Sequence, residues 1–135
     1  MKRSMTNNAP PPRRPTDAEL EILRVLWDLG EATVREVQET LEKRPAAGYT
    51  TVLKLLQIMT EKGLVERNES SRAHVYRARL ERAETEKQLV GDLLERAFGG
   101  SSSRLVLQAL ASKTASEEEI AEIREFLDRV PGEKS

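Results

Sequence analysis

The sequence predicts a mainly α-helical protein with a minor β component, in which a winged helix-turn-helix domain is followed by a C-terminal helical region. Three observations support this fold class. Helix-start signatures recur along the chain, and an apolar-periodic helix beginning near Tyr49 leads through Gly63 into two short strands around a charged turn. Beyond residue 81, only amphipathic helices are predicted.

The composition divides the chain into four parts. Residues 1–14 are rich in Pro, Asn and Arg and show no apolar period, which is typical of a flexible tail. We expect the winged-helix domain over residues 15–80 and the helical region over residues 81–131. A short disordered tail is expected over residues 132–135.

Capping boxes predict the starts of three helices. In this motif, a Ser or Thr hydroxyl and a Glu carboxylate three residues later satisfy backbone amides that the first helical turn leaves free. The motif occurs in Thr16 with Glu19, Thr33 with Glu36, and Ser116 with Glu119. We therefore expect helices over about residues 17–29 and 34–43, and a third from residue 117 onward.

The apolar stripes of the first two helices are expected to form a core. The stripes contain Leu20, Ile22, Leu23, Leu26 and Trp27 on the first helix, and Val34, Val37 and Leu41 on the second. We interpret Trp27 as a core anchor. Gly30 closes the first helix, and Pro45 and Gly48 break the chain after the second.

The next helix, over residues 50–62, has one apolar and one polar face. Val52, Leu55, Leu56 and Met59 fall at i, i+3, i+4 and i+7, and Gly63 follows as a stop signal. Two strands are then predicted over residues 64–67 and 73–77, where apolar and polar residues alternate around a charged turn. This order is typical of a recognition helix with a wing.

The C-terminal part is predicted to contain three amphipathic helices: residues 82–98, a second capped by Ser101–Ser103, and a third capped by Ser116. Gly99-Gly100 ends the first of them. So small a unit buries a low fraction of its apolar surface, which favours a homodimer and makes this part a helical dimerisation region. The expected dimerisation residues are Leu89, Leu93, Leu94, Phe98, Leu105, Leu110, Ile120, Ile123 and Leu127.

The composition excludes several functional classes. The 135 residues contain no cysteine and a single histidine, His74, so no metal site or cofactor is expected. No apolar run reaches the roughly 20 residues that a membrane helix needs, and no secretory signal is recognised. We expect a cytoplasmic protein that is not an enzyme.

The net charge of −1 is unevenly distributed. Residues 1–79 contain 14 Lys and Arg against 11 Asp and Glu, whereas residues 80–135 contain 8 against 12. Because phosphate contacts depend on local charge, the basic half, which holds the predicted wing, is the candidate half for DNA binding. An excess of three charges is also ordinary for a protein surface.

Double-stranded DNA is the expected partner. The polar face of the helix over residues 50–62 is expected to meet the major groove, where Gln57 suits adenine and Lys54 suits guanine or phosphate. The charged turn is expected to contact the backbone or the minor groove, with Arg72 as its strongest candidate. The candidate DNA-binding residues are Tyr49, Thr50, Thr51, Lys54, Gln57, Arg67, Ser70, Ser71 and Arg72.

Four segments carry a family resemblance. They are Pro15-Thr16-Asp17-Ala18-Glu19-Leu20-Glu21-Ile22-Leu23 with Leu26-Trp27, then Val34-Arg35-Glu36-Val37, Tyr49-Thr50-Thr51-Val52-Leu53 and Glu61-Lys62-Gly63-Leu64-Val65. In this order and spacing they resemble the penicillinase-repressor (BlaI/MecI/CopY-type) family, over about residues 15–130. The resemblance implies a homodimeric transcriptional repressor bound to an inverted-repeat operator.

Two branches of that family differ in how they leave DNA. Copper-responsive members carry Cys-rich C-terminal motifs, which this chain lacks. β-Lactam-responsive members are cleaved at an Asn-Phe pair after a membrane-bound sensor metalloprotease is triggered. The corresponding pair here is Gln108-Ala109, so the resemblance names a candidate cleavage site but the pair departs from the family's pattern.

Two other functions stay open from the residues alone. The first is a winged-helix adaptor that binds protein rather than DNA, and the near-neutral total charge permits it. The second is a small hydrolase or nuclease, for which the sequence offers neither a partnered histidine base nor a spaced set of metal ligands. Duplex DNA binding that weakens steeply with salt would separate a repressor from an adaptor.

Overall fold

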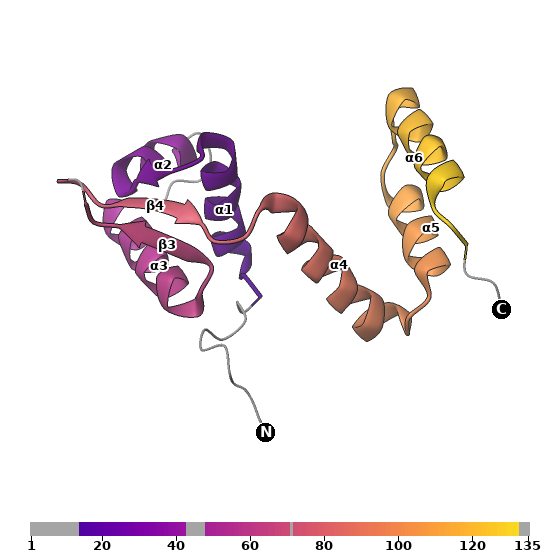
Figure 1. The fold of residues 1–135 in the computed structure, drawn as a ribbon, viewed down its shortest axis with the longest axis horizontal. Helices are drawn as coiled ribbons and strands as arrows, with labels where there is room; N and C mark the ends of the chain where they lie inside the picture. Colours follow the sequence, from indigo (N-terminus) through magenta and orange to yellow (C-terminus); the bar gives the residue numbers. More distant parts are fainter. Residues whose placement is uncertain (1–13, 43–47, 71, 133–135) are drawn as a thin grey trace, which may run out of the picture. The chain divides into compact units, whose positions relative to one another are not determined.

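The computed structural model describes residues 14–42, 48–70 and 72–132. Its elements follow in the order α1 (Asp17–Leu29), β2 (Ala32–Thr33), α2 (Val34–Leu41), α3 (Tyr49–Lys62), β3 (Val65–Asn68), β4 (Val75–Ala78), α4 (Arg82–Phe98), α5 (Ser102–Ser112) and α6 (Glu117–Arg129) (Figure 1). The predicted fold class is confirmed: a mainly helical chain contains one small antiparallel sheet. The chain forms two compact units, Met1–Leu89 and Val90–Ser135, called here the N-terminal and C-terminal units.

The predicted helix starts are confirmed by their hydrogen bonds. Capping boxes form at the N-termini of α1, α2 and α6, each with a Ser or Thr hydroxyl and a Glu carboxylate that accept from each other's backbone amides. The end of α2 at Leu41 comes earlier than predicted, and Pro45, to which the break was attributed, lies outside the described residues. The predicted terminal tails also lie outside them, except for Arg14 and Gly132.

Both wing strands begin later than predicted, β3 at Val65 and β4 at Val75. The closure of α3 explains the later start of β3. Gly63 adopts a left-handed conformation with φ of 83°, and the Leu64 amide donates back to the Met59 carbonyl at 2.9 Å. Leu64 therefore belongs to the helix closure, and β3 starts at Val65.

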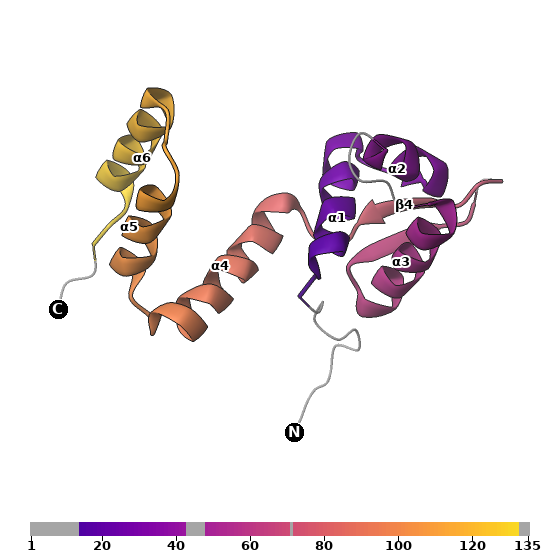
Figure 2. The ribbon, with the colours of Figure 1, turned by 180° about the vertical axis from the view of Figure 1, so that it is seen from behind.

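A third strand, β2, was missed by the sequence analysis. Its two residues pair antiparallel with β4, with Ala32 opposite Tyr76, and β4 pairs with β3 on its other side. Two residues directly before a capping box show no alternation, so no pattern identifies them as a strand. The sheet packs with α1, α2 and α3 in the N-terminal unit, which Figure 2 shows from behind.

The core of the N-terminal unit joins the three helices to the sheet. Its buried apolar residues are Ile22, Leu23, Val25, Leu26, Ala32, Val34, Val37, Leu41, Val52, Leu56, Met59, Leu64, Val65 and Tyr76. Three predicted core residues, Leu20, Trp27 and Leu55, are only partly buried and pack against this cluster. The core thus holds α3 by one stripe of side chains.

The start of α4 is fastened to α1. The Trp27 indole nitrogen donates to the Leu80 carbonyl at 2.9 Å, and the Arg82 guanidinium lies 5.4 Å from the Trp27 ring centroid. Arg82 also pairs with Asp28 at 2.7 Å, and Thr85 is buried. Trp27 is therefore an anchor, as predicted, although at the edge of the core.

The C-terminal unit contains the second half of α4 together with α5 and α6. Gly99 and Gly100 have φ of 56° and 84°, so they end α4 as predicted. Ser101 caps α5 by accepting from the Arg104 amide, and Arg104 donates to the Phe98 carbonyl at 2.9 Å. No residue of α5 or α6 is fully buried.

A buried ion pair joins α1 to α3. The Glu19 side chain is 3% exposed, and its carboxylate accepts from Lys62 Nζ at 2.8 and 3.0 Å. Burial alone raises the pKa of this carboxyl, but hydrogen bonds from Lys62 and Thr16 outweigh burial and lower the pKa below its ordinary value. The C-terminal end of α3 is therefore tied to the first turn of α1.

Replacing Lys62 by methionine leaves the Glu19 carboxylate buried without its counter-ion. We expect Lys62→Met to lower the free energy of unfolding by about 2 kcal/mol at pH 7. Because the folded-state pKa of Glu19 is lowered, this contribution is present above its ordinary value of 4.5 and is lost as the pH falls below it. Urea unfolding at pH 7 and at about pH 3.5 measures both effects. Lys87→Met, at an exposed position of α4, is the control. An equal loss at both pH values would contradict the assignment.

Candidate nucleic-acid interface

The helix α3 presents a polar face opposite its buried stripe. Val52, Leu56 and Met59 are 0% exposed and hold the helix against the core. The predicted contact residues Thr50, Thr51, Lys54 and Gln57 are all exposed on the other side. A major-groove reader needs this arrangement, in which packing fixes the helix without using its polar side chains.

The N-terminus of α3 differs from those of α1 and α2. Gly48 occupies the N-cap position without a side-chain hydrogen bond, and the first turn contains no acidic residue. By contrast, the first turns of α1 and α2 carry Glu19 and Glu36, whose carboxylates occupy the N-cap amides. Amides that no described side chain caps, and a helix dipole that no first-turn carboxylate compensates, suit a phosphate group, so α3 offers the best anion site of these three helix starts among the described residues.

Arg35 lies beside this helix start, and the sequence analysis did not select it. Its guanidinium carbon is 5.6 Å from the centroid of the Tyr49 ring, and both side chains are exposed. Arg35 sits inside the capping box of α2, where the sequence signal describes a helix start rather than a ligand contact. Tyr49 is thus positioned by a cation at the entrance of α3.

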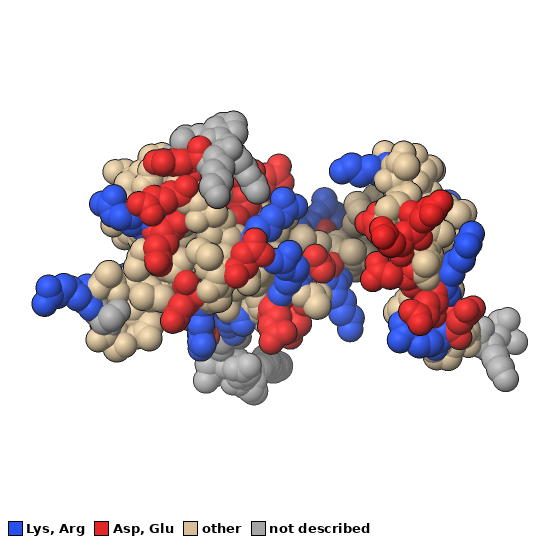
Figure 3. All heavy atoms as spheres, turned by 90° about the horizontal axis from the view of Figure 1, so that it is seen from above, with Lys and Arg blue, Asp and Glu red and all other residues tan. Residues whose placement is uncertain are grey.

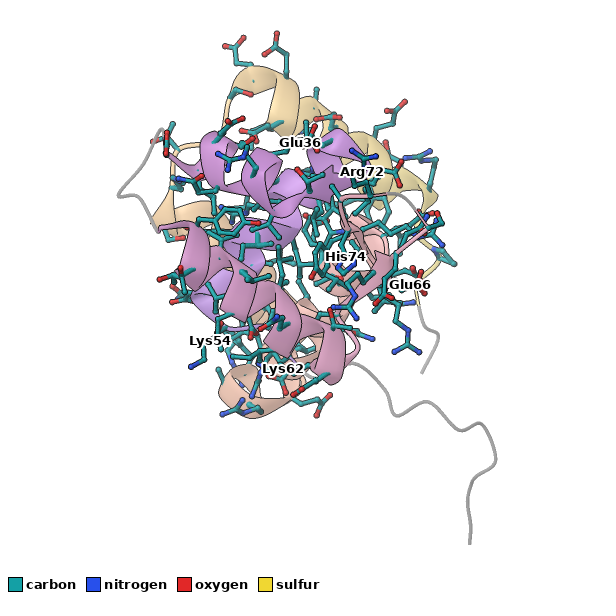
Figure 4. All side chains as sticks on the ribbon, turned by 90° about the vertical axis from the view of Figure 1, so that its left-hand side faces the viewer. Glu36, Lys54, Lys62, Glu66, Arg72 and His74 are labelled. Carbon is teal, nitrogen blue, oxygen red and sulfur yellow. The ribbon has the colours of Figure 1, made fainter. Side chains whose placement is uncertain are left out.

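A depression connects the starts of α2 and α3 with the wing. It has a volume of about 440 Å³ and is lined by Thr33, Val34, Arg35, Tyr49, Leu53, Arg72, Ala73, His74 and Tyr76. In Figure 4, which looks onto this side, Lys54 extends outward from α3, while Arg72 and His74 come from the hairpin. Two guanidinium groups and an imidazole therefore border one concave surface, which fits a polyanion such as a DNA strand.

Arg67 has intramolecular partners. It forms a hydrogen bond with the buried Tyr76 side chain and an ion pair with Glu69, and both partners raise the pKa of its guanidinium. Arg67 therefore braces the wing. At the tip, the Ser70 amide donates to Asn68 Oδ1 at 2.9 Å, whereas the predicted contact residue Ser71 lies outside the described residues.

Acidic and basic side chains are mixed on one face of the molecule (Figure 3). On the face shown in Figure 3, acidic and basic side chains are interspersed, and acidic ones gather over α5 and α6. The outward face of the sheet carries an exposed pair, Glu66 with Arg77, at 3.1 Å.

The described residues hold neither a metal-binding group nor a membrane-spanning helix. Within residues 14–42, 48–70 and 72–132, no group of three or more His, Asp or Glu side chains is arranged to hold a metal ion. No helix in the described part of the chain is long and apolar enough to span a membrane. The exposed face of α3 and the adjoining depression form the candidate functional site.

The fold and this site define the class of winged helix-turn-helix DNA-binding proteins. The family model described as penicillinase repressor matches residues 15–129. The chain belongs to the penicillinase repressor (BlaI/MecI) family of DNA-binding transcriptional repressors, which are not enzymes. The resemblance proposed from the four sequence segments is confirmed.

Individual relatives agree with this assignment. The chain is similar to the penicillinase repressor of Bacillus licheniformis, with 26% identity over 113 residues that cover 84% of this chain and 88% of the relative. It is 33% identical to the transcriptional regulator BlaI of Mycobacterium tuberculosis over 103 residues, which cover 76% and 75% of the two chains. It is 20% identical to the methicillin resistance regulatory protein MecI of Staphylococcus aureus over 114 residues, which cover 84% and 93%.

Removing the Tyr76 hydroxyl tests the brace on Arg67. We expect Tyr76→Phe to lower the free energy of unfolding, because the contact of the buried hydroxyl with Arg67 is lost while the ring is kept. Tyr49→Phe is the matched control, since that side chain is 44% exposed, and its stability should not change. Urea unfolding of the three proteins measures the difference. Equal stability of both variants and wild type would show that the hydroxyl does not hold the wing.

Proposed function

We propose that the chain acts as a homodimeric repressor that binds an inverted-repeat operator through α3 and the wing. The observation that carries this proposal is the exposed polar face of α3, whose N-terminus has no acidic residue and no cap from a described side chain. Each protomer would read one half-site, and the twofold symmetry of the dimer would match that of the operator. The site of action is then the cytoplasm, where the operator lies.

The proposed contacts divide into base reading and positioning. Thr50, Thr51, Lys54 and Gln57 project from the first turns of α3 and are assigned to the major groove. We assign five residues to the phosphate backbone: Tyr49, Ser70, Ser71, Arg72 and, in addition, Arg35. Arg67 is ranked below Arg72 because Glu69 and Tyr76 already engage it.

Dimerisation is proposed from the apolar surface of the C-terminal unit. Its large exposed apolar side chains are Val90, Leu93, Val106, Leu107, Phe126, Leu127 and Val130, and their exposed fractions range from 42% to 64%. The other predicted dimerisation residues of this unit, such as Leu105 and Ile123, are half-buried. A patch of this kind favours a protein interface, and a second copy of the chain is the partner that symmetry makes simplest.

We also propose that proteolysis at Gln108-Ala109 releases the repressor from DNA. Gln108 and Ala109 are exposed but lie within α5, so a protease would cleave there only after the helix unwinds locally. A membrane-bound sensor metalloprotease is the proposed partner for this step. The test is incubation of the repressor with such a protease from the same genome: a cut at this bond would support the proposal, and an intact chain would point to another release mechanism.

Two alanine substitutions test the DNA-binding face. We expect Lys54→Ala and Arg72→Ala each to weaken binding to a duplex selected from a random-sequence pool by about tenfold. Arg72→Ala should also reduce the steepness of the salt dependence by about one, because a phosphate contact is lost. Fluorescence anisotropy over a range of salt concentrations measures both quantities.

Arg124→Ala, at an exposed position of α6, is the matched control and should bind as wild type does. If all three variants bind alike, the docking face is misassigned. If wild type binds no duplex at low salt, the adaptor alternative replaces the repressor proposal.

An acidic substitution tests the dimer. Leu127 is 62% exposed in the single chain, and Leu127→Asp should convert a dimer into a monomer because an aspartate would be buried at the interface. Sedimentation at micromolar concentration measures the molecular mass. Leu29→Asp, at a position that is 51% exposed on α1, is the control and should stay dimeric. A monomeric wild type would contradict the role given to the C-terminal unit.

A further inference from the structure

One apolar side chain interrupts the polar face of α3. The large apolar residues of this helix that are exposed are Tyr49, at its start, and Ile58, which is 37% exposed. Ile58 follows Lys54 by four residues and Thr51 by seven, so all three lie on one stripe of the helix. Ile58 is therefore part of the face proposed to enter the major groove.

Packing in the core does not explain why residue 58 is apolar. The neighbouring residues Leu56 and Met59 are 0% exposed and point into the N-terminal unit, whereas Ile58 is turned away from that buried stripe and is 37% exposed. Glu61, one turn further along the exposed side, is acidic and would be repelled by phosphate. The surface compatible with DNA thus extends along α3 to Ile58 and ends there.

The chemistry of the major groove offers one partner for such a side chain. Base edges in this groove present hydrogen-bond donors and acceptors, together with a single apolar group, the C5 methyl of thymine. We propose that Ile58 packs against a thymine methyl in each half-site and so determines specificity at one base pair. This inference rests on the proposed binding of operator DNA by α3.

Replacing thymine by uracil removes the methyl group and leaves the base pair intact, so it isolates the proposed contact. On a duplex selected from a random-sequence pool, we expect wild type to lose about fourfold in affinity when one particular thymine of each half-site is replaced, which corresponds to one methyl-sized group. Ile58→Ala should bind the thymine duplex about fourfold more weakly and lose nothing further on the uracil duplex. Ile58→Val should keep most of the discrimination.

Leu29→Ala provides the matched control, because Leu29 is an exposed apolar residue of α1 and not part of the α3 face. It should discriminate thymine from uracil as wild type does, and circular dichroism should show that every variant is folded. If Ile58→Ala weakens both duplexes and keeps the discrimination, or if no thymine position matters to wild type, the inference is overturned while the proposed function stands. If wild type binds no duplex, both fail together.

Discussion

The one-sided burial of α3 is the constraint on which the rest of the structure depends. Val52, Leu56 and Met59 have no exposed surface, so the rotation of the helix about its axis is fixed by packing alone. The Glu19–Lys62 pair then ties its C-terminal end to α1, and the Gly63 closure sends the chain directly into β3. Helix orientation and wing position are consequently set by the same few residues. The exposed face is left without a packing role.

The N-termini of α1, α2 and α3 differ in the charge carried by their first turns. Capping boxes with carboxylates neutralise the starts of α1 and α2, whereas the start of α3 carries no acidic residue. Arg35 and Arg72 border the depression next to it. A chain with a net charge of −1 can therefore still present a local site for phosphate, because the relevant quantity is the field at one surface and not the total charge.

Most of the fold could be predicted because its signals are local. Capping boxes, the i, i+3, i+4, i+7 stripe of α3 and stop glycines each depend on residues within one or two helical turns. The features that were missed depend on residues far apart in the sequence. β2 exists only because β4 pairs with it, the Trp27–Leu80 hydrogen bond spans two elements, and the Arg35–Tyr49 contact needs α2 and α3 packed together. The contact of Arg67 with Tyr76 likewise depends on the pairing of β3 with β4.

The central claim is that the exposed face of α3 and the wing form a single surface for duplex DNA. The most direct test is nuclear magnetic resonance of the isotope-labelled full-length chain during titration with a selected duplex. We expect the largest changes in amide chemical shift over residues 49–58 of α3 and residues 67–74 of the hairpin. The amide shifts of α5 and α6 should change little. Shift changes concentrated in α5 and α6, or none along α3, would contradict the claim.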